Sequence, residues 1–451
     1  MAHQFSNHVQ FKSRLTFILA ATGSAVGLGN IWKFPYMTGE NGGGAFVFVY
    51  LVCVIAMGIP IMMAETMLGK RGRKNPISTM TTLAGEARAN PAWKYLGWMG
   101  VLAGVIILSY YSVIAGKTIH YIARILTGLL WDLDLAGAEA AIDGLNGSIF
   151  LLTLWHTLFI GLTMYIVMQG VNEGIEKAVE FLMPGLFLVL MVLVVYGAMS
   201  DGFQQGIDFM FTVDFGSLSA DSVLMALGQA FFTLSLGMGA IMVYGSYLPP
   251  DVSIAKTSAI VALCDTLVAI LAGIAIFPIV FANGLEPSVG PDLIFKTLPL
   301  AFSGMFAGTL FGLMFFVLLV FAALSSSISL IEPAISYSVE KWGLTRKIAC
   351  IGAGIITWTL GMGTVFSTNI WIDKKFFGTT FFGFLDYLTA NIMLPLGGIL
   401  IAVFAGWIMR QSDTAESLQI SEDGYLYRLW KFLVCYVAPI AVGLVLLGGL
   451  F

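Results

Sequence analysis

Long apolar stretches recur along this chain from residue 14 to its end, and they restrict its fold more than any other feature. A helix needs about 20 apolar residues to cross a bilayer. This length predicts eleven spans, near 14–36, 44–69, 97–126, 149–169, 177–199, 221–248, 255–281, 305–340, 347–366, 384–410 and 427–450. Only 11% of the residues are charged, against about 25% in soluble domains. The sequence therefore predicts an all-α polytopic membrane protein.

The distribution of basic residues predicts the orientation of these spans, because Lys and Arg stay preferentially on the cytoplasmic side. With the N-terminus inside, sixteen of the 22 Lys and Arg residues fall on the inner side. The six on the outer side are Lys33, Lys117, Arg124, Lys296, Lys374 and Lys375. We expect a protein of the cell membrane with a cytoplasmic N-terminus and, after eleven spans, an extracellular C-terminus.

Several function classes find little support in the composition. The formal net charge is −4, and no basic run is long enough to follow a phosphate backbone, so we expect no nucleic-acid partner. The four cysteines lie singly in apolar stretches, which predicts free thiols. The four histidines form no HExxH motif, and a glycine-rich phosphate loop is missing, so we expect no enzyme. We expect membrane lipid to surround the protein.

Glycine clusters interrupt the first and sixth spans at their centres, at residues 23–30 and 235–239. An unwound turn in hydrocarbon leaves backbone groups needing partners, so it is tolerated where it lines a site. Close helix packing through small residues is the alternative reading. However, these spans begin two successive groups of five, as expected of an inverted-repeat transporter. We predict a segment 1–13, repeats 14–199 and 221–410, and a last helix 427–451.

Four motifs carry a resemblance to a known family: GSAVGLGNIWKFP at 23–35, ENGGGAF at 40–46, QAFFTLSLGMG at 229–239 and ALSSSI at 323–328. They resemble the signatures of the neurotransmitter:sodium symporters, in the same order and on the same spans. The eleven-span form is similar to bacterial members. The resemblance implies two inverted five-helix repeats with helices one and six broken. It also implies sodium-coupled uptake of hydrophobic or neutral L-amino acids by alternating access.

By this resemblance two sodium ions would be bound, and sodium as a hard cation prefers oxygen ligands. The first site would use Ala25, Asn30, Thr233 and Asp265 with the substrate carboxylate. The second would use Gly23, Val26, Ala322, Ser325 and Ser326. Asp265 stands where many relatives have Asn, and Ala269 where chloride-dependent relatives have Ser, so we expect chloride-independent transport. A protonated, hydrogen-bonded core Asp265 is the alternative.

The resemblance also implies a substrate pocket. Its residues would be Ser24, Ala25, Leu28, Gly29, Ile107, Tyr111, Phe232, Thr233, Ser235, Met238, Ser326 and Leu330. N–H groups at the unwound turn and the Tyr111 hydroxyl suit a carboxylate, while carbonyls and the Ser326 hydroxyl suit an ammonium group. Gly27 stands where amine-transporting relatives have Asp, which argues for an amino acid. The apolar residues of this set suit an aliphatic or aromatic side chain.

Gate positions follow from the same resemblance. Tyr111 and Phe232 would form an aromatic lid, and Lys33 with Asp386 an outer ion pair. Glu340 and Tyr247 would belong to the inner gate, where the usual Arg-x-x-Trp reads HVQF at 8–11. The partner of Glu340 stays open among His8, Lys12 and Arg14. Glu65 would support the broken sixth span, and Gly174 with Pro184 would let span five unwind. Glu332 would either form a local pair or carry a proton.

Two other functions stay open at this point. A proton-coupled amino-acid permease would share the architecture, although it should lack the side-chain oxygens of Asn30, Thr233 and Asp265. A sensor that binds an amino acid without transporting it would need the same pocket. The sequence makes no prediction of oligomeric state.

Overall fold

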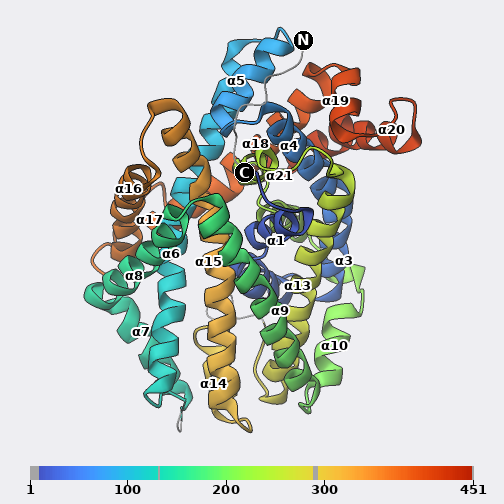
Figure 1. Cartoon of the computed structure of the whole chain (residues 1–451). Helices are drawn as coiled ribbons and strands as arrows, with labels where there is room; N and C mark the ends of the chain where they lie inside the picture. The colour runs from blue at the N-terminus through green and yellow to red at the C-terminus, as the bar shows by residue number, and fades with distance from the viewer. Residues whose placement is uncertain (1–9, 131–132, 288–292, 449–451) are drawn as a thin grey trace.

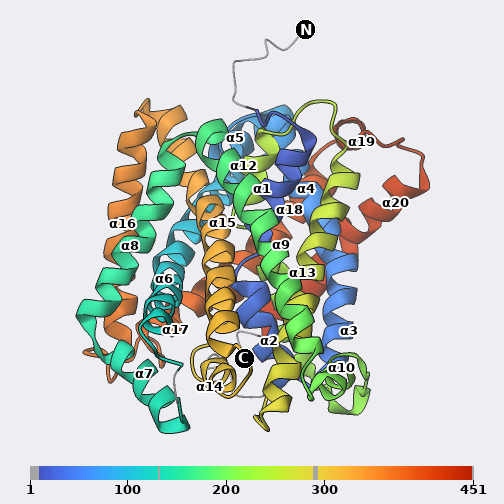
Figure 2. The ribbon, with the colours of Figure 1, turned by 60° about the horizontal axis from the view of Figure 1, so that its bottom comes forward.

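The computed structural model describes residues 10–130, 133–287 and 293–448. In this part of the chain every regular element is helical, apart from an isolated bridge between Phe376 and Thr379. Nine of the described helices are long and apolar enough to cross a membrane, and the bent pair Arg14–Ala25 and Gly29–Glu40 makes a tenth. These observations confirm the predicted all-helical polytopic fold (Figures 1 and 2).

Most spans consist of a single long helix, and others join two or more shorter ones. The helices at the eleven predicted spans are, in chain order, α1 (Arg14–Ala25) with α2 (Phe34–Glu40), α3 (Gly44–Cys53) with α4 (Ile59–Gly72), α6 (Lys94–Leu126), α8 (Ile149–Met168), α9 (Lys177–Ala198), α11 (Ala220–Thr233) with α12 (Ala240–Ser246), α13 (Ile254–Ala282), α15 (Gly308–Trp342), α16 (Arg346–Ser367), α17 (Phe381–Tyr387) with α18 (Leu394–Val403), and α20 (Tyr425–Phe432) with α21 (Ala438–Gly448). The interrupted pair α11 and α12 is the one of these eleven that is not among the ten candidate spans of the described residues.

Both predicted helix breaks are present. The first span ends its α1 part at Ala25, turns into extended backbone at Val26 and continues after a bend of 50°. In the sixth span α11 and α12 are separated by residues 234–239, where Ser235, Gly237 and Gly239 all have positive φ. Glycine adopts this backbone without the steric cost that other residues pay, so the glycine cluster explains where the helix stops.

Close packing brings the second span against the broken sixth one. A Cβ atom added at Gly69 of α4 would lie only 1.9 Å from the Met242 carbonyl oxygen of α12. Small residues allow membrane helices to approach to this degree. Beside the break, the Glu65 carboxylate of α4 accepts a hydrogen bond from the Gly237 N–H at 3.0 Å. Glu65, a buried side chain of span two, therefore accepts a hydrogen bond from a backbone N–H group that the break in span six leaves unpaired. This is the role expected for Glu65.

Short helices fill the connections between spans and separate to the two ends of the bundle. They are α5 (Pro76–Glu86), α7 (Leu135–Gly147), α10 (Phe203–Phe211), α14 (Thr297–Ser303) and α19 (Gln411–Leu418). In both views α5 and α19 lie at one end, and α7, α10 and α14 lie at the other. The apolar stretches do not predict these helices, since all five lie between the predicted spans. Their division between the ends agrees with the alternating direction of the spans.

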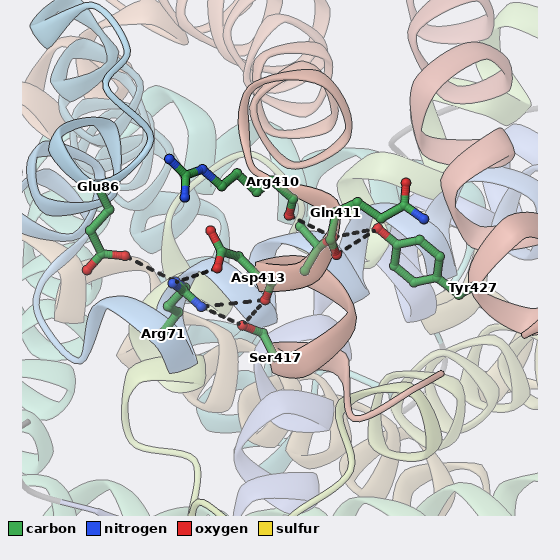
Figure 3. A network of polar contacts seen from close by, with 8 residues as sticks. Arg71, Glu86, Arg410, Gln411, Asp413, Ser417 and Tyr427 are labelled. Carbon is green, nitrogen blue, oxygen red and sulfur yellow. Dashed lines mark hydrogen bonds and ion pairs between the residues drawn. The ribbon is translucent and has the colours of Figure 1, made fainter. Parts of the chain in front are cut away.

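An arginine joins three elements at the end that carries α5 and α19 (Figure 3). Arg71, in the last turn of α4, pairs with Glu86 of α5 at 3.1 Å and with Asp413 of α19 at 3.4 Å. Its guanidinium also lies 3.4 Å from the Ser417 hydroxyl. The planar guanidinium has five N–H donors, so a single side chain can serve several partners.

Candidate functional site

A small cavity of about 30 Å³ lies between the two helix breaks. Its walls come from α1, α6, α11, α15 and the unwound segments. The structure brings together all twelve residues of the predicted substrate pocket here and adds Gly27 to them. The pocket is therefore a property of the folded chain, since its residues are separated by up to 306 positions, from Ser24 to Leu330.

The first break presents backbone groups to one end of this cavity. The Leu28 N–H donates to the Tyr111 hydroxyl at 3.2 Å, and the Gly27 N–H donates to the Asn30 side-chain oxygen at 3.0 Å. A Cβ atom at Gly27 would lie 2.5 Å from the Ser326 Oγ and 3.1 Å from the Tyr111 hydroxyl. No side chain fits at position 27 unless these two hydroxyl groups move.

Serine hydroxyls hold the unwound segment of the first span to its neighbours. Ser235 Oγ donates to the Ser24 carbonyl at 2.8 Å, and Ser24 Oγ donates to Ser329 Oγ at the same distance. Ser326 Oγ lies 3.1 Å from the Val26 carbonyl and 3.3 Å from that of Gly23. The break is thus linked both to the sixth span and to α15.

Three buried polar side chains converge on one side of the cavity. The Asn30 amide donates to the Asp265 carboxylate and to the Thr233 hydroxyl, both at 2.7 Å. Thr233 Oγ1 lies 3.1 Å from each carboxylate oxygen of Asp265. These are the side chains of the predicted first sodium site. Asp265 and Thr233 direct oxygen atoms into the cluster, and a hard cation prefers oxygen ligands. Asn30 directs its NH2 group toward them, while its side-chain oxygen accepts from the Gly27 N–H.

The residues of the predicted second sodium site meet between α1 and α15. Ser325 Oγ lies 3.0 Å from the Ala322 carbonyl and 3.5 Å from that of Val26. Ser326 Oγ contacts the carbonyls of Gly23 and Val26, as described above. Three carbonyls and two hydroxyls therefore occupy one small region, and every one of these polar groups presents an oxygen.

The outer gate differs from its prediction. No ion pair between Lys33 and Asp386 is found in the described part of the chain. Instead, the Lys33 ammonium lies over the Phe232 ring, 4.5 Å from its centroid. A lysine carries a compact charge without the bidentate fork of arginine, and an aromatic face attracts such a charge at this distance. Lys33 therefore contacts the predicted lid directly.

The inner end also differs from its prediction. Glu340 accepts hydrogen bonds from the Asn75 backbone N–H at 2.9 Å and from its side-chain amide at 2.7 Å. Among the described residues neither Lys12 nor Arg14 forms an ion pair with Glu340, and Lys12 lies 3.9 Å from Glu176 instead. The third candidate, His8, lies outside the described residues. Asn75 is the N-cap of α5, so Glu340 fixes a connecting helix. Sequence reasoning missed this partner because Asn75 carries no charge.

A buried network surrounds Glu332 on α15. Arg346 binds both carboxylate oxygens of Glu332, at 3.0 and 2.5 Å, and Tyr247 donates to the same carboxylate at 2.8 Å. Arg346 also donates to the Val167 carbonyl at the end of α8, at 2.7 Å. Of the two roles open for Glu332, the local pair is the one present in this structure. Arg346 was missed, although its charge at the start of a span was a readable signal.

The N-terminal segment packs under Tyr247. The Phe11 N–H donates to the Tyr247 carbonyl at 3.0 Å. The buried Phe11 ring contacts those of Tyr244 and Tyr247, with centroids 5.8 Å apart in each case. An aromatic side chain thus occupies the inner end of the first span, beside the Glu332 network.

The start of the fifth span is irregular. Residues Val171–Glu176, which include Gly174, form a π-helical turn ahead of α9, and Pro184 lies inside α9. Proline removes a backbone donor from the helix, and π-helical turns are frequent at functional sites. In this conformation the segment is helical and not unwound.

Comparisons with known proteins agree with these observations. The model of the sodium:neurotransmitter symporter family matches residues 8–136 and 145–450. The uncharacterized sodium-dependent transporter YhdH of Bacillus subtilis is 36% identical, over 98% of this chain and 97% of its own. An uncharacterized sodium-dependent transporter of Haemophilus influenzae is 33% identical, over 98% of both chains.

A solved structure shows the same fold. The crystal structure of MhsT in complex with L-phenylalanine has 42% sequence identity and a TM-score of 0.91, and the match covers 98% of this chain and 99% of that one. Two broken spans around a central pocket, a family match over almost the whole length and these relatives lead to one conclusion. The chain belongs to the sodium:neurotransmitter symporter family, as a sodium-dependent multi-pass membrane transporter and not an enzyme.

Proposed function

We propose that this protein carries hydrophobic L-amino acids into the cell by sodium symport, with two sodium ions moved in each cycle. The observation that carries the proposal is the cavity between the two breaks, beside which two groups of oxygen atoms gather that would suit sodium. The related MhsT was crystallised with L-phenylalanine, which supports an amino acid as the substrate here.

The polar end of the cavity suits the two charges of an amino acid. The substrate carboxylate would meet the N–H groups near Leu28 and Gly29, the Tyr111 hydroxyl and the first sodium ion, because an unwound helix presents N–H dipoles to an anion. The ammonium group would meet carbonyls of the first and sixth spans and the Ser326 hydroxyl. An amine without a carboxylate would need a counter-ion at position 27, where no side chain fits.

The apolar end would receive the substrate side chain. Ile107, Met238 and Leu330 line it, and none of them offers a hydrogen bond. Methionine is unbranched and adapts its shape to different neighbours. We therefore expect the site to accept both aliphatic and aromatic side chains, as long as they are uncharged.

The fixed charge of Asp265 supports transport that does not require chloride. Asp265 lies against Asn30 and Thr233, in the first sodium cluster. A carboxylate buried in a span normally has a functional partner, and here that partner would be sodium. The carboxylate would thus supply the negative charge that chloride brings to other family members, so replacing chloride by gluconate should leave uptake unchanged.

Alternating access would expose the cavity first outward and then inward. Spans one, two, six and seven would rock against spans three, four, eight and nine. The start of span five would unwind at Gly174 and Pro184 and admit water to the second sodium cluster, since Met183 of α9 lies against Gly23. Hydrogen exchange should then rise at residues 171–176 when sodium is removed. Unchanged protection there in the inward-open state would contradict this step.

Uptake of radiolabelled leucine and phenylalanine into proteoliposomes tests the main proposal. An inward sodium gradient should stimulate uptake, and an inside-negative potential should increase it further, because two cations accompany a zwitterion. A pH gradient should not replace the sodium gradient. Stimulation by protons alone would favour a permease, and binding without uptake would favour a sensor.

A further inference from the structure

A second hollow lies on the outer surface of the bundle, away from the central cavity. It has a volume of about 620 Å³ and follows α16 over the region of Ile355 to Phe366. Apolar side chains form most of its wall, among them the aromatic Phe366, Trp371 and Phe381. Figures 1 and 2 place α16 at the edge of the bundle, next to α8. We call this hollow the α16 groove.

The aromatic side chains of the groove belong to one cluster, which forms its aromatic end. The Trp371 ring lies 5.2 Å from Phe366 and 5.9 Å from Phe381, between centroids. Phe376 joins them, 5.3 Å from Phe381. A Cβ atom at Gly363 would lie 2.3 Å from the Phe381 ring, so this ring lies directly on the backbone of α16. Packing therefore defines the shape of this end.

Positive charge lies beside the aromatic end. The Lys374 ammonium is 5.6 Å from the centroid of Trp371, and Lys375 follows it on the exposed connecting segment, with Asp373 as the adjacent acidic residue. The neighbouring Ile372 and Phe377 are 54% and 91% exposed. Tryptophan, exposed apolar groups and lysine together are typical of the level where hydrocarbon meets lipid headgroups. The segment therefore lies at the membrane interface, while the groove extends into the hydrocarbon.

We propose that the α16 groove binds an anionic phospholipid, with an acyl chain along α16 and the phosphate beside Lys374 and Lys375. Lipid tails are as apolar as leucine, so the groove alone would hardly prefer one lipid over another. Each lysine near a membrane surface favours an anionic lipid roughly fivefold, and Asp373 opposes part of this effect. The preference therefore arises from the headgroup, and the groove fixes the position of the tail.

Photo-crosslinking tests the site in the full-length protein reconstituted into phosphatidylcholine vesicles. A phosphatidylglycerol with a diazirine in its acyl chain is added at a low mole fraction, and crosslinked peptides are identified by mass spectrometry. We expect labelling of α16 near Ile355 and of the Trp371 segment. Unlabelled phosphatidylglycerol should displace the probe roughly tenfold better than phosphatidylcholine.

Three variants separate the headgroup from the tail. The double substitution Lys374→Gln and Lys375→Gln should remove the preference for phosphatidylglycerol. Lys347→Gln removes an exposed lysine from the opposite end of the same helix and should leave the preference intact. Thr359→Trp fills the exposed groove and should abolish labelling of α16. Labelling spread evenly over the lipid-facing helices would overturn the proposal.

Discussion

Gly27 lies where the hydroxyls of Ser326 and Tyr111 leave no space for a side chain. Alanine at this position would push against both groups, and overpacking of this kind costs about 1–3 kcal/mol. We expect Gly27→Ala to weaken binding of L-phenylalanine and L-leucine by roughly tenfold or more. Equilibrium binding of the radiolabelled amino acid to the purified protein measures the change.

Gly161→Ala is the matched control for this substitution. Gly161 also lies in a membrane-spanning helix, but a Cβ atom there meets nothing within 4 Å. We expect normal binding in this variant, because alanine is favoured over glycine in helices. Equal binding by Gly27→Ala and Gly161→Ala would show that the two hydroxyls do not define the polar end of the pocket.

Asp265 makes a separate prediction at the first sodium cluster. Asp265→Asn keeps the size of the side chain but removes its charge, and a charge pair near 4 Å contributes about 4 kcal/mol at intermediate dielectric. We expect the sodium concentration for half-maximal uptake to rise at least roughly tenfold. Asp251→Asn, in an exposed loop, should leave it unchanged. A sodium response that is the same in both variants would support the alternative of a hydrogen-bonded core carboxyl.

Individual pocket residues could be predicted because they lie in or near sequence motifs of fixed spacing, and these motifs mark the two helix breaks. All twelve predicted residues line the cavity. Partners of charged residues were less predictable. Lys33 lies over Phe232, Glu340 binds the neutral Asn75, and Glu332 binds Arg346. Each of these contacts depends on how separate helices approach one another, which a single sequence does not specify.

Between elements, the Arg346 network joins the end of α8 and the start of α16 to Glu332 within α15. Removing one member of a buried pair leaves the other charge without compensation, which costs about 3–5 kcal/mol. We expect Arg346→Ala to lower the midpoint of thermal unfolding by several degrees. A thiol-reactive dye can follow the unfolding, since Cys53, Cys350 and Cys435 are free and buried.

Two further variants identify the cause of this destabilisation. Lys347→Ala removes the adjacent, exposed cation and should change the midpoint little. The double substitution Glu332→Leu and Arg346→Leu removes both charges, and apolar replacement of a buried pair is often neutral. We expect it to recover most of the stability. A double variant as unstable as Arg346→Ala would mean that packing, not charge, is responsible.

The spans themselves were predictable because their length and apolar character follow from the thickness of a bilayer. The helices of the connections, such as α7 and α10, were not predicted. Their sequences are mixed in polarity, and they are stabilised by packing on the ends of the spans. The sequence also did not predict which type of helix forms, since the π-helical turn at Val171–Glu176 has no simple sequence signature.

For the whole molecule, the distribution of basic residues predicts which end faces the cytoplasm. We expect Asp143→Cys, on the exposed face of α7, to react in intact cells with a membrane-impermeant maleimide. Lys341→Cys, at the end of α15, should react only after permeabilisation. Both variants carry Cys264→Ser, since Cys264 is the native thiol that is not fully buried. The reverse pattern would invert the proposed orientation and the direction of uptake.

The broken sixth span has a consequence for how the protein is made. Its halves have 14 and seven residues, about 21 and 10 Å of helix, whereas the hydrocarbon is about 30 Å thick. Neither half can be released from the translocon into lipid as a self-sufficient segment. Its partner α4, with Glu65, is synthesised much earlier and supplies the missing hydrogen-bond acceptor. The central site can therefore form only once the second and sixth spans have met in the membrane.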